Sequence, residues 1–353
     1  MTQIQVRQDT TANWNNASAI TPAVGELCYA TDGDKLLKIG DGTHKFNSAD
    51  LPHFTKSDEM AYAELSEHLY NGVDLKTKFA TEIAGYSDEW AWLKARKNAN
   101  NFAGIHVGDY IDISLSAGTV GTYTITAKTL RARILGIDTY YRYGDSEVGH
   151  HIDFKTDQTV GTNMVWNPNN NNNGTAVEEN PWLASALYAY LNGVNNYTTN
   201  AYNDVAHGAD ASAGGILQLL PSKLTNQIIE KRLYVPRMYS ASGLLTQPNE
   251  GKWANIGKLW LPFETEVYGR AVNSIAKDVY GYDRNNMGSA VQYPLFAGTA
   301  GDRNKKLCGR AHWWLASATS GSSTLACRVY GGGIADSDGC TSPWFSAPVC
   351  FRI

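Results

Sequence analysis

The sequence predicts an α+β protein with more than one domain. Its 353 residues exceed the length of an ordinary single domain. Several stretches alternate apolar and polar residues, which indicates strands, whereas others repeat apolar residues at helical spacing. Hydrophobic residues make up 43% of the chain and charged residues 18%, as in a folded globular protein and unlike a disordered one.

Residues 1–54 are expected to form a small β-rich module. Ile4 and Val6 alternate with polar residues, as in a half-buried strand. Residues 25–32 and 35–42 indicate two more strands, and the Asp32-Gly33-Asp34 sequence between them is a strong hairpin signal. Because so small a module buries little apolar surface, we expect it to assemble with copies of itself.

Residues 55–103 indicate a linker of short helices. Apolar residues recur at helical spacing in three groups, which are Leu65 and Leu69, then Leu75, Phe79 and Ile83, then Trp90 and Leu93. The candidate N-caps are Ser57, Asp74 and Ser87. Such narrow apolar stripes suit packing around a symmetry axis or against a neighbouring domain, and an ordinary helical linker explains them equally well.

Residues 104–353 are expected to form one α+β domain. Its strand-like segments are 107–113, 130–137, 150–154 and 349–353, and its helices are expected at 182–192 and near 215–231. In the final strand Val349, Phe351 and Ile353 share one face. Residues 167–174, which are Asn-Pro, five asparagines and glycine, are expected to form an exposed loop because they offer no apolar surface to bury.

Charge and hydropathy exclude several classes of partner. The net charge is −4 and no strongly basic stretch occurs, so we expect no nucleic-acid binding. The first residues lack the apolar core of a signal peptide, and no apolar run reaches the roughly 18 residues that a membrane span requires. We therefore expect synthesis in the cytoplasm and no membrane insertion.

Metal and cofactor motifs are weak throughout. The five cysteines, Cys28, Cys308, Cys327, Cys340 and Cys350, form no Cys-x-x-Cys pair, and their odd number favours packed thiols. His150 and His151 would point to opposite faces of a strand, so a structural role is favoured. The Gln247-Pro248-Asn249 triplet lacks the carboxylate of a calcium-dependent sugar site. We expect no metal and no cofactor.

The N-terminal pattern resembles a known phage module. It comprises residues 4–14, Gly25-Glu26-Leu27, and Lys38-Ile39-Gly40-Asp41-Gly42-Thr43. It is similar to the short N-terminal module of phage tail fibres, including the major tropism determinants. This resemblance implies an intertwined, β-prism-like attachment and trimerisation module over residues 1–54.

Residues 104–353 carry a second resemblance. The segments that carry it are Val107-Gly108-Asp109-Tyr110-Ile111, Trp182-Leu183-Ala184-Ser185, Leu191-Asn192, residues 258–269, Tyr293-Pro294-Leu295-Phe296, Trp313-Trp314-Leu315-Ala316-Ser317 and residues 347–353. They resemble a family of C-type-lectin-fold domains in gut-phage and bacterial proteins. Several members are variable proteins of diversity-generating retroelements, which randomise adenines of a template.

Together the two resemblances imply a host-receptor adhesin at a phage tail tip. The implied partners are a host cell-surface protein or glycan, other tail proteins, and two further copies of the chain in a homotrimer. The implied location is the virion. The helical stretch and the long region 104–300 depart from the layout of the tropism determinants.

Residues 318–346 have the composition of a diversified segment. They contain no Lys, Glu, Gln or Met and are rich in Ser, Gly, Thr, Ala and Asp. Adenine randomisation of an asparagine codon yields this set of residues. It cannot yield tryptophan, so Trp344 is interpreted as fixed scaffold together with Trp313 and Trp314. An ordinary loop rich in glycine and serine, with no diversification, would have a similarly low content of charged residues.

Alternation along this segment predicts which side chains face outward. Leu325, Cys327 and Val329 would point to the core. The receptor-contact candidates, of types that antibody loops also use, are Thr319, Ser320, Ser322, Ser323, Thr324, Arg328, Tyr330, Gly332, Ile334, Asp336, Ser337, Asp338, Cys340, Ser342 and Phe345.

Two alternative functions remain open. One is a bacterial or prophage lectin-fold protein with a fixed ligand. The other is an oxidase of the formylglycine-generating type, a class that shares the fold and uses a cysteine pair. Because Cys327 and Cys350 fall on predicted buried strands, packed thiols are the favoured interpretation. We expect no catalytic residue and no enzymatic activity.

Overall fold

The computed structural model describes two compact units, Met1–Tyr70 and Asn71–Ile353. The described residues are 6–10, 13, 21–30, 37–46, 53–54, 71–146, 148–194, 214–274, 292–297 and 308–353. The start of the first predicted strand at Ile4, the predicted 32–34 turn and the helix signals at Ser57, Leu65 and Leu69 lie outside this part of the chain.

The first unit contains a small sheet. Its described strands are β1 (Val6–Asp9), β2 (Leu27–Ala30), β3 (Leu37–Ile39) and β4 (His53–Phe54), hydrogen-bonded in that order. β2 and β3 are antiparallel, which confirms the predicted hairpin, whereas β1 runs parallel to β2. Among the described residues its buried apolar cluster consists of Cys28, Ala30 and Phe46, a very small core.

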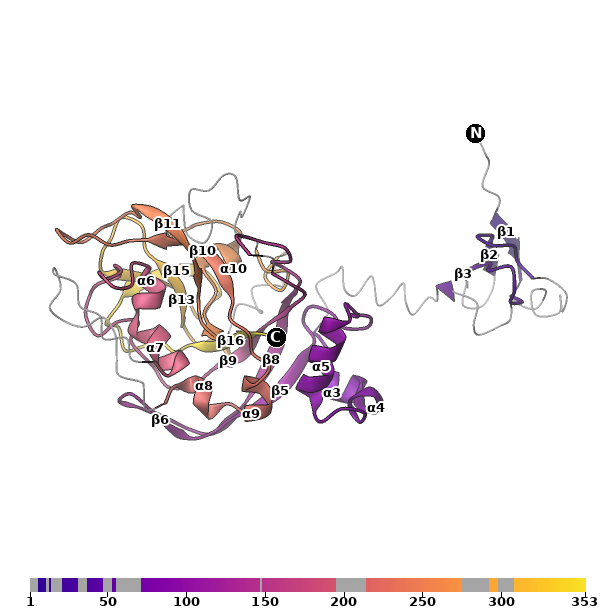
Figure 1. Ribbon diagram of the computed structural model, residues 1–353, viewed down its shortest axis with the longest axis horizontal. Helices are drawn as coiled ribbons and strands as arrows, with labels where there is room; N and C mark the ends of the chain where they lie inside the picture. Colours follow the sequence, from indigo (N-terminus) through magenta and orange to yellow (C-terminus); the bar gives the residue numbers. More distant parts are fainter. Residues whose placement is uncertain are drawn as a thin grey trace. The chain divides into compact units, whose positions relative to one another are not determined.

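A five-stranded antiparallel sheet forms the frame of the second unit (Figure 1). Its spatial order is β12 (Leu259–Trp260), β16 (Pro348–Arg352), β9 (Ile152–Thr159), β8 (Lys128–Ile137) and β5 (Tyr110–Leu115). The strands predicted within residues 107–113, 130–137, 150–154 and 349–353 are all present. β16 lies between β12 and β9 and is buried on both faces. The alternation of its side chains therefore does not distinguish a solvent-exposed face from a buried one.

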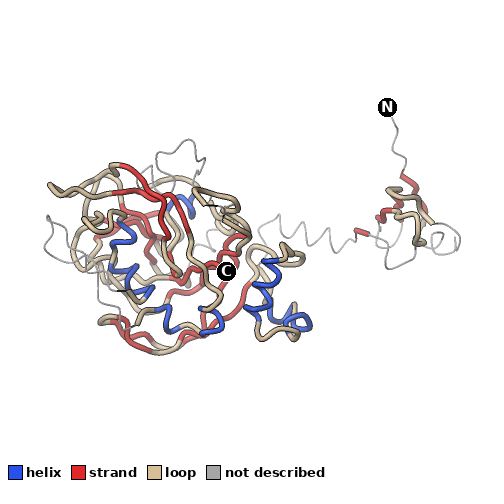
Figure 2. Tube along the Cα trace, viewed as in Figure 1, coloured by secondary structure: helices blue, strands red, loops and turns tan. Residues whose placement is uncertain are grey.

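A three-stranded antiparallel sheet is formed by residues that lie between β12 and β16 in the sequence. It consists of β13 (Trp313–Ala318), β14 (Leu325–Val329) and β15 (Ala335–Gly339). Two hairpins complete the described strands, β6 (Gly118–Val120) with β7 (Tyr123–Ile125), and β10 (Arg232–Arg237) with β11 (Glu250–Asn255). Strands and loops predominate over helices (Figure 2), which agrees with the predicted α+β class.

The described helices are short. They are α3 (Leu75–Lys78), α4 (Ala80–Ile83), α5 (Glu89–Asn98), α6 (Pro181–Ala184), α7 (Ala186–Asn192), α8 (Ile216–Leu219), α9 (Ser222–Thr225) and α10 (Glu264–Tyr268). The predicted 182–192 helix is broken at Ser185, whose hydroxyl caps α7 by accepting from the Tyr188 amide. The helix predicted near 215–231 is two single turns separated by Pro221, which has no amide hydrogen.

The helices α3 to α5 belong to the second unit and are not a free linker. Asp74 caps α3 as predicted, but Asp88, not Ser87, caps α5 by accepting from two amides. Trp90 of α5 is fully buried and meets the rings of Phe154 and Phe351 edge to face. This segment therefore packs into the main core. Of the alternatives given for its apolar stripe, this agrees with packing against the neighbouring domain.

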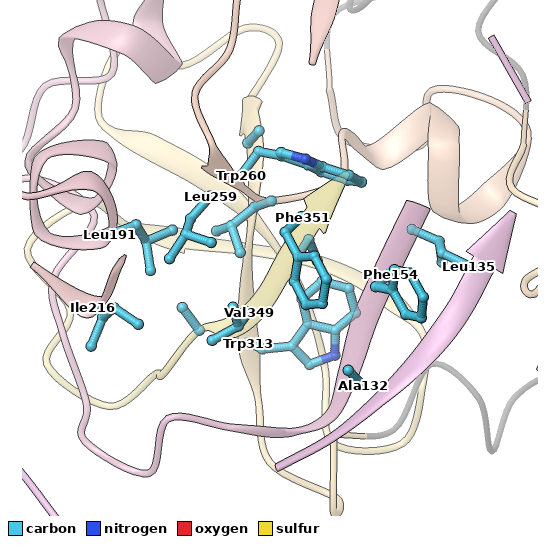
Figure 3. Packing of buried hydrophobic residues seen from close by; sticks show 14 of the residues in the cluster. Ala132, Leu135, Phe154, Leu191, Ile216, Leu259, Trp260, Trp313, Val349 and Phe351 are labelled. Atoms are coloured by element: carbon cyan, nitrogen blue, oxygen red, sulfur yellow. The ribbon is translucent and has the colours of Figure 1, made fainter. Parts of the chain in front are cut away.

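Aromatic rings fill the centre of this core (Figure 3). Phe154 of β9 and Phe351 of β16 stack with their ring centroids 5.0 Å apart. Trp313 of β13 lies beside this pair, and Leu191 of α7 is directed toward the sheet from the helical side. Each fully buried side chain of this size contributes roughly 1.5–3 kcal/mol to folding. The five-stranded and three-stranded sheets are therefore joined through this aromatic core.

A cluster of charges is buried within the same frame. Arg352 on β16 donates two hydrogen bonds, of 2.7 and 2.8 Å, to the carboxylate of Asp153 on β9. Lys231 and Glu266 form a second fully buried ion pair at 2.5 Å, and the Tyr140 hydroxyl donates to the same Glu266 oxygen. Burial alone would raise the pKa of Asp153, but the charge and hydrogen bonds of Arg352 lower it to about 2.

No described helix has the length and apolar character needed to cross a bilayer.

Candidate functional site

The three-stranded sheet ends in an exposed turn between β14 and β15. The Tyr330 amide donates to the Ile334 carbonyl at 2.9 Å, and the Gly333 amide donates back to Tyr330 at 2.7 Å. Tyr330 is 44% exposed and Ile334 57%, and Gly332 between them is also exposed. We call Tyr330, Gly332 and Ile334 the Tyr330 end of the sheet.

The turn between β13 and β14 lies at the opposite end. Ala318 pairs with Ala326, whereas Trp313 pairs with Val329, so this turn and Tyr330 are separated by the length of β14. That length is roughly 16 Å for five residues. Within the turn the hydroxyls of Ser322 and Thr324 are 3.1 Å apart. We call residues 319–324 the Ser320 end.

An arginine and two aspartates connect the ends along one face of the sheet. Arg328 of β14 contacts Asp336 at 2.7 Å and Asp338 at 3.2 Å through the same nitrogen. The aspartates are two residues apart on β15 and therefore share a face. Their side chains are 36% and 38% exposed, whereas that of Arg328 is 11% exposed. Two half-exposed carboxylates thus lie above one covered cation.

Aromatic rings surround the Arg328 guanidinium. Its central carbon is 4.1 Å from the ring centroid of Phe345 and 5.7 Å from that of Tyr330. Its other terminal nitrogen lies 2.9 Å from Nδ1 of His312. Because arginine only donates, Nδ1 must accept, which requires a neutral His312 ring. Burial, and then the charge of Arg328, lower the pKa of His312 and favour this neutral form.

Eleven of the fifteen receptor-contact candidates are at least partly exposed. Tyr330, Gly332 and Ile334 are exposed, and the partly exposed ones are Ser320, Ser322, Ser323, Thr324, Asp336, Ser337, Asp338 and Ser342.

The expected outward orientation is wrong for Arg328, Cys340 and Phe345, which are buried, and the receptor-contact candidate Thr319 is buried as well. Thr319 forms a bridge with Ser274 of a separate loop. Phe345 packs against Trp314 and covers Arg328, which explains the burial of both. The Cys340 carbonyl accepts from two amides of the 166–167 segment, so that segment covers the cysteine.

Two of the three tryptophans assigned to the scaffold lie in the core, and the third lies at the surface. Trp313 and Trp314 are fully buried, and Trp314 donates its ring N–H to the Met164 carbonyl at 2.9 Å. Trp344 is instead 73% exposed, because it occupies the turn before the final strand. Of the residues predicted to face the core, Cys327 and Val329 are buried and Leu325 is half-buried.

The asparagine run is the largest departure from the predicted surface. Asn171, Asn172 and Asn173 are almost completely buried, so the predicted exposed loop is wrong for them. The Asn172 amide group donates to the carbonyls of Ser322 and Leu325 at 2.8 and 2.6 Å. Asparagine can lie inside a protein when the backbone of another segment satisfies its amide. Here that backbone is the Ser320 end together with the first residue of β14.

A second buried polar residue, Glu264, holds a loop that contacts the Ser320 end. Glu264 is fully buried, and its carboxylate accepts from the backbone amides of Val272, Asn273 and Ser274 at 2.6 to 3.1 Å. The Asn273 carbonyl in turn accepts from the Ser320 amide at 2.8 Å. Nothing in the sequence around Glu264 indicates this role, because its partners lie eight to ten residues away in irregular backbone.

The thiols of Cys308, Cys340 and Cys350 are buried, and His150 and His151 form hydrogen bonds with neighbouring residues. Burial raises the pKa of the Cys308, Cys340 and Cys350 thiols, which opposes formation of a thiolate. His150 lies 2.7 Å from Asp138, and His151 accepts from the Tyr140 amide at 3.2 Å. Within the described residues, no group of three His, Cys, Asp or Glu side chains is placed to hold a metal ion.

Comparison with known families adds to this geometry. Residues 4–44 match the family described as the major tropism determinant N-terminal domain, which supports a phage tail protein of the tropism-determinant type. Residues 156–353 match a family described as a domain of unknown function, DUF6273. Because this match covers more than half of the chain, the protein belongs to that family. No curated protein matches the chain. No solved structure matches it either.

Proposed function

We propose that this protein is a tail-tip adhesin of a phage, which binds a host-surface receptor through the exposed side of the β13–β14–β15 sheet. The observation that carries the proposal is the display of large side chains on a rigid support. Tyr330 and Ile334 are exposed in the turn that joins two strands of a sheet whose residues Trp313 and Trp314 are fixed in the core. Exposed aromatic and apolar groups on a rigid element are typical of binding surfaces. The tropism-determinant match of residues 4–44 supports the phage context.

Three finer statements belong to the same proposal. The second unit is a C-type-lectin-like domain, the first is a β-prism-like module that trimerises, and residues 318–346 are diversified by a retroelement. The very small described core of the first unit supports assembly with other copies. Three copies on one tip would raise avidity by about a hundredfold or more over a single weak site.

Binding, and not catalysis, is the proposed activity. The burial of Cys308, Cys340 and Cys350 removes them from contact with a substrate and disfavours their reactive thiolate form. The exposed groups of the sheet are hydroxyl, aromatic, aliphatic and carboxylate side chains, which suit recognition by shape and hydrogen bonding.

Replacing Tyr330 by alanine tests the proposal. Tyr86 is a matched control, because it is a tyrosine of almost equal exposure, 45% against 44%, in the helical segment. Purified full-length Tyr330→Ala should bind at least tenfold more weakly than wild type to cells of the bacterium that the phage infects. Tyr86→Ala should bind normally, and both should melt as wild type. Unchanged binding by Tyr330→Ala would contradict the proposed surface.

Sequencing of sibling isolates tests diversification separately. Substitutions confined to residues 318–346, together with a reverse-transcriptase gene and an adenine-differing template copy nearby, are the expected result. An invariant segment would leave a lectin-fold protein with a fixed ligand.

A further inference from the structure

Two surface loops outside residues 318–346 are attached to the Ser320 end. The Gly321 amide donates to the Thr246 carbonyl at 3.1 Å, and the Gln247 amide group donates to the Ser320 hydroxyl at 2.7 Å. The other loop contacts the turn through the Ser320 amide and the Asn273 carbonyl. We call residues 244–247 and 272–274 the rim loops.

Each rim loop is held from behind by a buried polar side chain. Asn173 both donates to the Leu245 carbonyl, at 2.8 Å, and accepts from the Leu245 amide. Glu264 accepts from three successive amides of the other loop. A buried carboxylate carries a large desolvation cost, which these amides help to offset while residues 272–274 keep this position. The positions of both loops are therefore fixed by the interior.

The rim loops nevertheless present apolar side chains to water. Leu244 is 39% exposed and Val272 is 49% exposed. Neither loop contains Lys, Arg, Asp or Glu. Interface cores are depleted of charged residues, so uncharged apolar side chains held beside the Ser320 end suit a receptor contact. The roughly 16 Å length of β14 also fits within a standard interface of about 800 Å² per partner, so one receptor can reach both ends of the sheet.

We propose that the rim loops form a constant part of the receptor-binding surface, with Leu244 and Val272 contacting an uncharged, apolar patch of the same receptor. This inference rests on the proposed adhesin function. It divides recognition in two: residues 318–346 select the receptor, and the rim loops add affinity that does not depend on the variable side chains or on salt.

The double substitution Leu244→Ser/Val272→Ser tests this division. The probe is the bacterial strain that the phage infects, and the protein is the purified full chain. Binding should weaken about tenfold, by the same factor at low and high salt, with an unchanged melting temperature. Val73→Ser is the control, since Val73 is also an exposed valine, 37% exposed, but lies beside α3. It should bind as wild type.

The outcomes separate the rim from the adhesin function itself. If the double variant binds like wild type while Tyr330→Ala loses binding, the rim inference is wrong and the proposed function stands. If a rim effect is present but changes strongly with salt, the contact is not the apolar one proposed. If neither the wild type nor any variant binds the cells, the proposed function fails and the rim inference fails with it.

Discussion

Two arginine–carboxylate clusters in the second unit differ in how completely the protein covers them. In the frame, Arg352 and Asp153 are both about 1% exposed or less and pair with each other through two hydrogen bonds. On the three-stranded sheet, Arg328 is covered but its partners Asp336 and Asp338 remain open to water. The first cluster has no capacity left for an outside partner, whereas the second has carboxylate oxygens that a receptor can reach.

This difference indicates a division of labour. A buried ion pair fixes one arrangement of strands, because breaking it leaves an uncompensated charge in the interior. In a half-exposed cluster one charged residue can be substituted without leaving an unpaired charge in the interior. Substitutions in such a cluster should therefore cost little stability. Variation is therefore expected on the three-stranded sheet and not in the five-stranded frame.

The largest expected effect is the loss of Arg352. Arg352→Met leaves the Asp153 carboxylate without its charge partner and should cost about 3–5 kcal/mol of unfolding free energy, measured by urea denaturation. The double variant Arg352→Met/Asp153→Asn is the control and should be more stable than the single variant, because the unpaired charge is gone. A loss below about 1 kcal/mol in the single variant would show that the frame does not depend on this pair.

A much smaller stability loss is expected on the sheet face. Arg328→Met preserves contact with Phe345 and leaves two carboxylates that water can solvate, so unfolding free energy should fall by about 1 kcal/mol or less. Binding to host cells should weaken, because both aspartates lose the cation that orients them. A stability loss equal to that of Arg352→Met would remove the distinction between the two clusters.

The smallest effect is a dependence on pH through His312. Its pKa is lowered from the ordinary 6.5, so the unfolded chain binds the proton more readily than the folded one. The stabilisation is complete above pH 6.5 and is lost as pH falls toward the lowered value. The pKa of His151 is lowered as well, chiefly by burial, so the His312→Asn variant is needed for comparison.

Denaturation midpoints between about pH 7 and pH 5 should therefore fall less steeply in the His312→Asn variant than in wild type. An NMR titration should find the His312 ring neutral at pH values where a free imidazole is half protonated. An elevated pKa would contradict the hydrogen bond from Arg328.

The sequence predicted the strands of the frame well, because buried strands such as 130–137 and 349–353 have a strong local pattern. It misjudged the asparagine run. Composition assigns asparagine to the surface, but the burial of Asn172 depends on the carbonyls of a turn 150 residues away. Such long-range pairing leaves no local signal.

The candidate surface was predictable as a segment but not residue by residue. Alternation correctly placed Cys327, Val329 and Tyr330, since they lie on or next to one regular strand. It failed for Arg328, Cys340 and Phe345, which other segments cover. The roles of Glu264 and His312 depend on contacts between distant loops and strands, and no spacing in the sequence reveals them.

The central claim is that exchangeable side chains on a fixed frame choose the target cell. It is tested most directly by exchanging residues 318–346 with the corresponding segment of a sibling phage that infects a different strain. Adsorption assays on both strains would measure the result. We predict that the chimaera adsorbs to the strain of the segment donor and melts like the parent. Adsorption that follows the rest of the chain would contradict the claim.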